Sequence, residues 1–285
     1  MIDLHLHSTC SDGSLRPTEL VTRARRLGLR GVGLTDHDTV AGVPEFVQAG
    51  KAADIAVVPG VEISAEWPSG TMHILGYFVD PSAPPLVEAL EWMRAGRHER
   101  NRRICERLRQ LGYAVRWEDV EAVAAGEVIG RPHIAEALRR RGYVGDIREA
   151  FDKLLGENRP AYVERRRLSP GRALAVIHES GGLAVLAHPV TLNLRDDELE
   201  ECVRSLTAQG LDGIECYYPE HDSAMTLFLL RLCRRYDLAP TGGSDYHGDN
   251  SPGIEMGRGS GNLAVPDEVL DNLRSRLSRR QGSPR

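Results

Sequence analysis

The chain has 285 residues, 41% of them hydrophobic and 27% charged, which suits a large globular core and excludes wholesale disorder. Its formal net charge of -5 argues against a protein that coats nucleic acid or a membrane as a whole. Five cysteines, an odd number without a C-x-x-C pair, favour a reduced, cytoplasmic location. We expect neither a signal peptide nor a membrane contact, because no apolar run approaches the roughly 20 residues that span a bilayer.

Short β-like runs alternate with helical patterns along both ends of the chain. In the first half the pattern predicts strands at 2–6, 31–34, 57–58 and 72–79, with helices at 17–27 and 43–53. After residue 170 it predicts helices at 172–179, 196–208 and 223–236, with strands at 183–187, 213–216 and a last one ending near 241. Such alternation indicates a parallel sheet, and we predict that this one closes into an α/β barrel.

Between these halves the alternation stops. Residues 92–167 are largely helical in pattern and carry about 18 Arg and Lys against about 12 Asp and Glu. We therefore predict a barrel formed by 1–91 and 168–278, a small helical domain inserted at 92–167 that caps the substrate, and a disordered tail at 279–285. A basic insert on an acidic body suits an anionic substrate, although a solvated helical surface explains most of these arginines equally well.

Histidines and carboxylates are concentrated where the predicted strands end. His5 and His7 lie two apart on the first strand, so that both point to one face together with Asp3, and two such imidazoles can share a metal ion. Asp12 follows in a turn that can fold back over them. The other positions after or within apolar strands are Asp36, His37, Asp38, Glu62, His73, His188, Asp245 and His247.

Buried polar groups are costly unless they bind something, and the carboxyl ends of barrel strands form the usual mouth of an active site. For any one of these side chains, a hydrogen-bonded place in the interior is an equally good interpretation. The complete set, at successive strand ends, predicts a metal-binding active site.

With these motifs the chain resembles the polymerase and histidinol phosphatase (PHP) family of metal-dependent phosphoesterases. The resemblance covers roughly residues 1–90 and 168–265 and rests on His5-Leu6-His7, Ser11-Asp12-Gly13, Thr35-Asp36-His37-Asp38, Gly60-Val61-Glu62, His73, His188 and Asp245-Tyr246-His247. The insert, through Ile129-Gly130-Arg131-Pro132-His133-Ile134 and its size, resembles the subgroup of 3′,5′-nucleoside bisphosphate phosphatases and 5′-to-3′ oligoribonucleases.

The resemblance implies a distorted (β/α)7 barrel with two or three divalent metal ions at the carboxyl ends of its strands. It implies one metal held by His5, His7, Glu62 and Asp245, a second held by the bridging Glu62 with His73 and His188, and a third held by Asp12, His37 and His247. Imidazole and carboxylate ligands without thiolate suit Mn²⁺, Zn²⁺ or Fe²⁺. The implied reaction is hydrolysis of a phosphate ester by a metal-activated hydroxide, on nucleoside 3′,5′-bisphosphates or short 5′-phosphorylated RNA.

Further residues are candidates for substrate binding and catalysis. We expect Arg131 and His133 to grip a substrate phosphate, because a guanidinium donates two parallel hydrogen bonds, although Arg131-Pro132 also suits a simple helix start. His221 is expected to protonate the leaving oxygen or bind phosphate, the alternative being a surface loop residue. Arg159 is a weaker phosphate candidate. Asp36 and Asp38 are expected to orient histidine ligands, and a turn cap is the alternative for either.

Three rival functions remain open from the sequence. Histidinol-phosphate phosphatase, or another small-molecule phosphatase, is disfavoured by the insert. A C–N hydrolase on a similar barrel is disfavoured because the two lysines, Lys51 and Lys153, lie away from the strand ends where that group places a carboxylated lysine. A non-enzymatic metal module is disfavoured because structural sites are usually closed and four-coordinate. Apart from nucleotide or RNA substrate, we expect no obligate protein partner.

Overall fold

A computed structural model describes residues 1–123 and 129–282 of the chain. The chain divides into two compact units, and we call Met1–Ala89 with Arg167–Arg285 the barrel unit and Leu90–Arg166 the helical unit. The bounds of the helical unit lie within two residues of the insert that we predicted at 92–167. That the helical unit caps a substrate stays a prediction.

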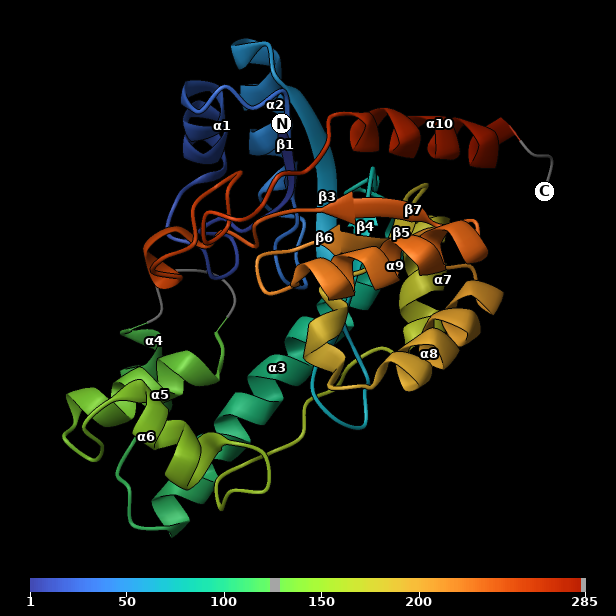
Figure 1. Cartoon of the computed structure of the whole chain (residues 1–285). Helices are drawn as coiled ribbons and strands as arrows, with labels where there is room; N and C mark the ends of the chain where they lie inside the picture. Colours follow the sequence, from blue (N-terminus) through green and yellow to red (C-terminus); the bar gives the residue numbers. More distant parts are fainter. Residues whose placement is uncertain (124–128, 283–285) are drawn as a thin grey trace. The chain divides into compact units, whose positions relative to one another are not determined.

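Among the described residues, seven strands form one sheet in which the spatial order follows the chain (Figure 1). Just beyond the last strand, the carbonyl of Tyr246 accepts a hydrogen bond of 3.0 Å from the backbone N–H of His7, so the sheet curls into a nearly closed barrel. The predicted distorted (β/α)7 barrel is thereby confirmed. The strands are β1 Ile2–Leu6, β2 Gly31–Leu34, β3 Ala56–Ala65, β4 Met72–Tyr77, β5 Leu183–Leu186, β6 Gly213–Tyr217 and β7 Ala239–Gly242.

Strand β4 departs from the parallel arrangement that we predicted. It pairs antiparallel with both β3 and β5, whereas the remaining neighbours in the sheet pair parallel. The reason is the connection, since only residues 66–71 separate β3 from β4 and a parallel pair needs a crossover of about a dozen residues or more. The reversal brings the start of β4, with His73, to the edge where the parallel strands end.

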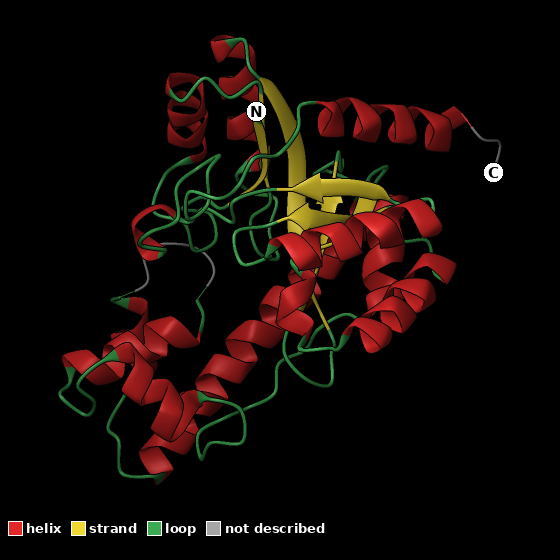
Figure 2. Cartoon of the chain, viewed as in Figure 1, coloured by secondary structure: helices red, strands yellow, loops and turns green. Residues whose placement is uncertain are grey.

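The helices of the barrel unit pack their apolar faces on the strands. On α1 and α2, Leu20, Val21 and Phe46 join one buried cluster with Leu34 of β2. These helices, drawn in red in Figure 2, are α1 Pro17–Arg26, α2 Val43–Ala53, α7 Pro170–Glu179, α8 Asp196–Ala208, α9 Ser223–Arg235 and α10 Glu268–Gly282.

Helix α10 was not predicted, because its many arginines hide the apolar positions. Val269, Leu270 and Leu273 are nevertheless buried in one cluster with Ile2 of β1. The helix runs to Gly282, and Arg280 donates to Asp212 at 3.2 Å, so the prediction of a disordered tail from residue 279 is wrong as far as residue 282. Residues 283–285 of that predicted tail lie outside the described part of the chain.

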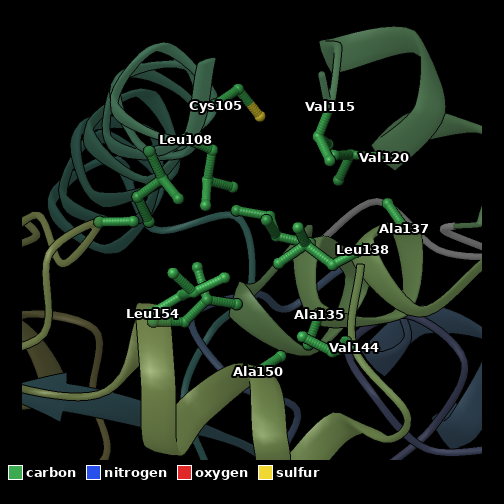
Figure 3. Packing of buried hydrophobic residues seen from close by; sticks show 14 of the residues in the cluster. Cys105, Leu108, Val115, Val120, Ala135, Ala137, Leu138, Val144, Ala150 and Leu154 are labelled. Carbon is green, nitrogen blue, oxygen red and sulfur yellow. The ribbon is translucent and has the colours of Figure 1, made fainter. Parts of the chain in front are cut away.

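The helical unit has a hydrophobic core of its own. Helix α3, Pro84–Gln110, runs into it from the barrel unit and contributes Ile104 and Leu108 at a helical spacing, while α5 contributes Ile134 and Leu138. Figure 3 shows this cluster, with Leu108, Leu138 and Leu154 among its labelled members. The remaining elements are α4 Trp117–Glu121, α5 Arg131–Arg140, α6 Ile147–Ala150 and a π-helix at Phe151–Leu155. Nowhere in the described chain is a helix long and apolar enough to cross a membrane.

The barrel can close because Gly243, the residue after β7, has no side chain. A Cβ at this position would lie 2.3 Å from the Cβ of His5 and 2.4 Å from its backbone nitrogen. The backbone that leads to Asp245 therefore passes directly against β1, and this contact sets the distance between two predicted metal ligands.

We predict that Gly243→Ala lowers the free energy of unfolding by about 1–3 kcal/mol, because backbone atoms of β1 would have to move. Urea denaturation of both proteins measures the difference. Gly282→Ala is the matched control, since no atom lies within 4 Å of a Cβ built there, and it should leave stability unchanged or slightly higher. Equal effects of the two substitutions would contradict the proposed contact.

Candidate metal centre

The structure gathers all nine predicted ligand side chains at the barrel edge where the parallel strands end. Three groups have ligand atoms within 4.8 Å of one another, namely His5, His7, Glu62 and Asp245; His7, Asp12, His37 and His247; and His37, Glu62 and His73. His188 joins them through its Nε2, which lies 2.9 Å from Glu62 Oε1. That these side chains bind metal ions through this assignment of ligands stays a prediction.

Glu62 is the centre of the cluster. Its side chain is fully buried, a position that is costly for a carboxylate without compensating charge. Burial alone would raise the pKa of Glu62, but the surrounding histidines hold it well below its usual value. The imidazole nitrogens around its two oxygens are those of His73 at 2.6 Å, His37 and His188 at 2.9 Å, His7 at 3.2 Å and His5 at 3.3 Å.

The geometry of these atoms fits metal coordination. Two ligands that each lie about 2.1 Å from one ion in tetrahedral or octahedral geometry are about 3.0–3.4 Å apart. Asp245 Oδ1 lies 3.1 Å from His7 Nε2 and 3.4 Å from His5 Nε2. Within the described residues, both ring nitrogens of His7, Nδ1 of His37 and Oδ1 of Asp245 are buried without a hydrogen-bond partner. Close polar atoms that do not hydrogen-bond to one another are the arrangement expected of ligands around a cation.

His37 belongs to two of the groups rather than one. Its Nδ1 lies 2.9 Å from Glu62 Oε2, and its Nε2 lies 3.7 Å from Asp12 Oδ2. The resemblance implied that His37 serves only the third metal, together with Asp12 and His247. The structure places the ring between that group and Glu62, and the sequence could not distinguish the two because both lie at neighbouring strand ends.

The histidines differ in their affinity for protons. Burial alone would lower the pKa of His7, but the nearby carboxylates of Asp245 and Glu62 raise it to about 10. Burial lowers the pKa of His73 to about 4. At neutral pH a lone pair of His73 is therefore available to a metal ion, whereas an ion that binds His7 must displace a proton.

Three backbone positions next to the cluster are strained. Asp38, His188 and Asp245 have positive φ angles of 52°, 23° and 55°. Residues with a side chain rarely adopt this region, and those that do concentrate at functional sites. His188 and Asp245 each follow a strand closely, so the strained turn aims a predicted ligand back over the strand ends.

Asp36 holds the loop that carries two ligands. Its carboxylate accepts hydrogen bonds of 2.7 Å and 2.6 Å from the N–H and hydroxyl of Ser8, and one of 2.6 Å from the hydroxyl of Ser11. These bonds fix the backbone between His7 and Asp12. The predicted contact of Asp36 with a histidine ring is therefore replaced, in the described structure, by contacts with that loop, and its catalytic role stays a prediction.

Asp38 and Asp3 hold other segments in the same way. The carboxylate of Asp38 accepts from the N–H of Ser64 in β3 at 2.8 Å. Asp3 accepts from the N–H and hydroxyl of Ser244 at 2.9 Å and 2.6 Å, and from the N–H of Gly257 at 2.7 Å. Asp3 thus fixes the residue that precedes Asp245, and it does so from the first strand.

Glu215 is a functional candidate that the sequence analysis did not single out. Its fully buried carboxylate accepts a hydrogen bond of 2.9 Å from Nδ1 of His5 and one of 2.8 Å from the N–H of His188. A carboxylate on Nδ1 leaves Nε2 of His5 free to act as a ligand and fixes the ring. The signal was a charged residue inside the apolar strand β6, whereas we had considered mainly the strand ends.

Tyr218 and His221 lie beside the cluster. The hydroxyl of Tyr218 donates to Asp245 Oδ2 at 3.1 Å, and its ring centroid lies 5.2 Å from that of His221. His221 is buried, so the alternative of a surface loop residue is wrong. Burial lowers the pKa of His221, and its Nδ1 lies 3.1 Å from the carbonyl of Cys216. A neutral ring that donates there presents Nε2 as an acceptor, so its role as proton donor or phosphate ligand stays a prediction.

The other substrate candidates lie in the helical unit. Arg131 begins helix α5, donates to the carbonyl of Leu155 at 3.1 Å and lies over the ring of Tyr162 at 5.5 Å. His133 accepts from the N–H of Gly130 at 3.0 Å, which caps the same helix. Arg159 is exposed. The predicted helix start is thus present at Arg131, and binding of phosphate by these three residues stays a prediction.

Comparisons with known proteins agree with this site. A model of the PHP domain family matches residues 3–226. A 5′-3′ exoribonuclease from Haemophilus influenzae is 35% identical over 268 residues, 94% of this chain and 96% of the relative. A 3′,5′-nucleoside bisphosphate phosphatase from Chromobacterium violaceum is 34% identical and covers 98% of each chain. A solved structure from Bifidobacterium adolescentis, described as a metal-dependent phosphoesterase, has a TM-score of 0.82 at 32% identity and covers 96% of both chains.

We predict that Glu215→Gln weakens binding of Mn²⁺ or Zn²⁺ by about 10- to 100-fold, because an amide holds the ring of His5 less firmly than a carboxylate does. Competition with a fluorescent chelator measures the affinity. Asp212→Asn is the matched control, since Asp212 is also buried, precedes the same strand and contacts His178 at 2.9 Å rather than a predicted ligand. Unchanged binding by Glu215→Gln, or an equal loss in the control, would contradict this role.

Metal removal should lower thermal stability. The cluster concentrates buried groups whose charges an ion balances, and a ligand at 100 times its dissociation constant stabilises the folded state by about 2.7 kcal/mol. We therefore expect Mn²⁺, Zn²⁺ or Fe²⁺ to raise the melting temperature of chelator-treated protein in differential scanning calorimetry. Glu62→Gln should lose most of that rise. A melting temperature that none of the three ions changes would contradict metal binding here.

Proposed function

The chain belongs to the PHP domain family, and from this premise we propose that it is a nucleotide phosphoesterase that works with two or three divalent metal ions. Its substrates are the 3′-phosphate of nucleoside 3′,5′-bisphosphates and short 5′-phosphorylated oligoribonucleotides. The observation that carries the proposal is the buried cluster around Glu62, in which five imidazoles surround one carboxylate. The two curated relatives described above, which together bear both activities in their names, support the choice of substrates.

The ligand set favours Mn²⁺, Zn²⁺ or Fe²⁺. Imidazole nitrogen and carboxylate oxygen suit these ions, and no cysteine is among the three groups. Three ions could be held by these residues. One ion would be held by His5, His7, Glu62 and Asp245. A second would be held by Glu62, His73 and His188 with His37 beside them, and a third by Asp12, His37, His247 and His7. When bound, such ions neutralise the oxygens of a phosphate ester and make a water molecule acidic enough to supply a nucleophile near neutral pH.

The residues of the chain supply position and proton control. Glu62 belongs to two of the three groups and would help to hold the ions of both. Glu215 keeps His5 in one orientation, and Tyr218 does the same for Asp245. Nε2 of His221 lies buried without a partner in the described structure, where it can accept a hydrogen bond from a water molecule or a ribose hydroxyl. Arg131, His133 and Arg159 are our candidates for holding a second phosphate of the substrate.

We predict that Mn²⁺-loaded protein releases phosphate from 3′,5′-adenosine bisphosphate and degrades a short 5′-phosphorylated RNA faster than it hydrolyses histidinol phosphate. Asp245→Asn should lower these rates by at least about 100-fold, because it removes a charged ligand that lies near both His5 and His7. Asp249→Asn, an exposed acid four residues away, is the matched control and should retain the wild-type rate.

Each outcome of this assay is informative. Hydrolysis of the bisphosphate or the RNA that depends on Asp245 supports the nucleotide assignment. Preference for histidinol phosphate would move the protein to the other branch of the family. No hydrolysis of any of the three, with bound metal verified, would overturn the assignment and direct attention to other phosphate esters and to C–N hydrolysis.

A further inference from the structure

The helical unit contains a groove that the predicted chemistry does not use. It has a volume of about 430 Å³ and is lined by side chains of α3, α4 and the loop between them. Arg102, Arg109 and Arg116 line it together with Trp117, over a floor of Cys105 and Val115. All these residues belong to the helical unit, and its volume is in the range of pockets that hold small organic ligands.

The arginines of the groove are exposed and positioned to attract anions. Arg102 and Arg109 lie two helical turns apart on one face of α3, and Arg116 directly precedes α4. In the described structure no carboxylate forms an ion pair with Arg102 or Arg116. Arg109 has one carboxylate nearby, that of Glu106, whose Oε1 lies 3.9 Å from Nη2 of the arginine. Glu118 also lines the groove, so the excess of positive charge is one. A modest excess suits a flexible strand whose phosphates can reach the arginines separately.

The aromatic wall of the groove provides a second kind of contact. Trp117 is half-buried and packs against the core of the helical unit, which fixes its indole ring. The guanidinium of Arg102 lies 5.8 Å from the ring centroid, and the exposed ring of His98 lies edge-on at 5.8 Å. A fixed indole beside a guanidinium is a platform on which a nucleic-acid base can stack.

We propose that this groove binds a single-stranded segment of an RNA substrate, with a base against Trp117 and phosphates on Arg102, Arg109 and Arg116. The proposal rests on the proposed function, because it presumes that oligoribonucleotides are substrates. It adds a point of attachment for RNA that is separate from the catalytic cluster, because every residue that lines the groove belongs to the helical unit. Binding through base stacking and phosphate contacts is tolerant of sequence, so the groove selects for strand length rather than for particular bases.

The test compares two triple substitutions with the same loss of charge. The groove variant loses the three positive charges of the groove through Arg102→Gln, Arg109→Gln and Arg116→Gln. The control variant loses three exposed arginines elsewhere in the helical unit through Arg139→Gln, Arg140→Gln and Arg148→Gln. Fluorescence anisotropy with a labelled 5′-phosphorylated RNA, in the Asp245→Asn background, should show binding at least about tenfold weaker for the groove variant only. The slope of the logarithm of the binding constant against the logarithm of the salt concentration should become less steep by about 2, because three phosphate contacts are lost.

Catalytic rates separate this proposal from the proposed function. The groove variant should lose kcat/KM on RNA in proportion to its loss of RNA binding. Its kcat/KM on 3′,5′-adenosine bisphosphate should stay within about twofold of the wild-type value. Trp117→Phe retains an aromatic ring and should therefore lose less kcat/KM on RNA than the groove variant. Equal binding of RNA by the two triple variants, or equal losses on both substrates, would overturn the groove. A wild-type protein that hydrolyses neither substrate would overturn the proposed function, while the anisotropy still decides the groove.

Discussion

The arrangement of the strand ends depends on one buried carboxylate, that of Glu62. Glu62 is fully buried, and ion pairs of this kind contribute net stability only when geometry and charge balance are good. The balance comes from imidazoles contributed by β1, β4 and the segments after β2 and β5, so four separate parts of the sheet converge on one residue of β3. The reversed strand β4 brings His73 to this point, and the turns with positive φ angles at His188 and Asp245 bring two more predicted ligands to it.

Around Glu62, a second set of carboxylates forms hydrogen bonds that connect separate segments of the chain. Asp3, Asp36, Asp38 and Glu215 all accept hydrogen bonds from backbone N–H groups of segments that carry predicted ligands or precede them. A carboxylate satisfied by backbone donors is a rigid tie between two segments, because its acceptor geometry fixes both. These hydrogen bonds hold the predicted ligands in place without an ion. This arrangement reduces the free energy that metal binding would otherwise spend on ordering the site.

The sequence predicted the secondary-structure elements, and the side chains that gather around Glu62, better than it predicted the relations between them. Strand β1, helix α2 and helix α8 begin and end where their periodicity indicated. The ligands could be found because imidazoles directly after apolar strands are poor core material and rarely serve packing alone. The predicted direction of β4 was wrong because the connection at residues 66–71 is too short for a parallel pair, although strands and helices alternate along the rest of this half of the chain. Glu215 and the double position of His37 are tertiary facts, since their partners lie 210 and 25 residues away, and periodicity carries no information on such pairs.

Under the proposed function, the two units would contribute separately to recognising a substrate. Imidazoles and bound cations would stabilise any phosphate ester, so the barrel unit alone would have little means to distinguish one leaving group from another. The helical unit has its own core and its own exposed arginines, and its surface can therefore change without disturbing the cluster. That separation explains how related chains of this architecture can bear the names of a mononucleotide phosphatase and of an exoribonuclease. If the proposed groove binds RNA, selection for substrate length would depend on the inserted helices, and the chemistry would depend on the side chains at the strand ends.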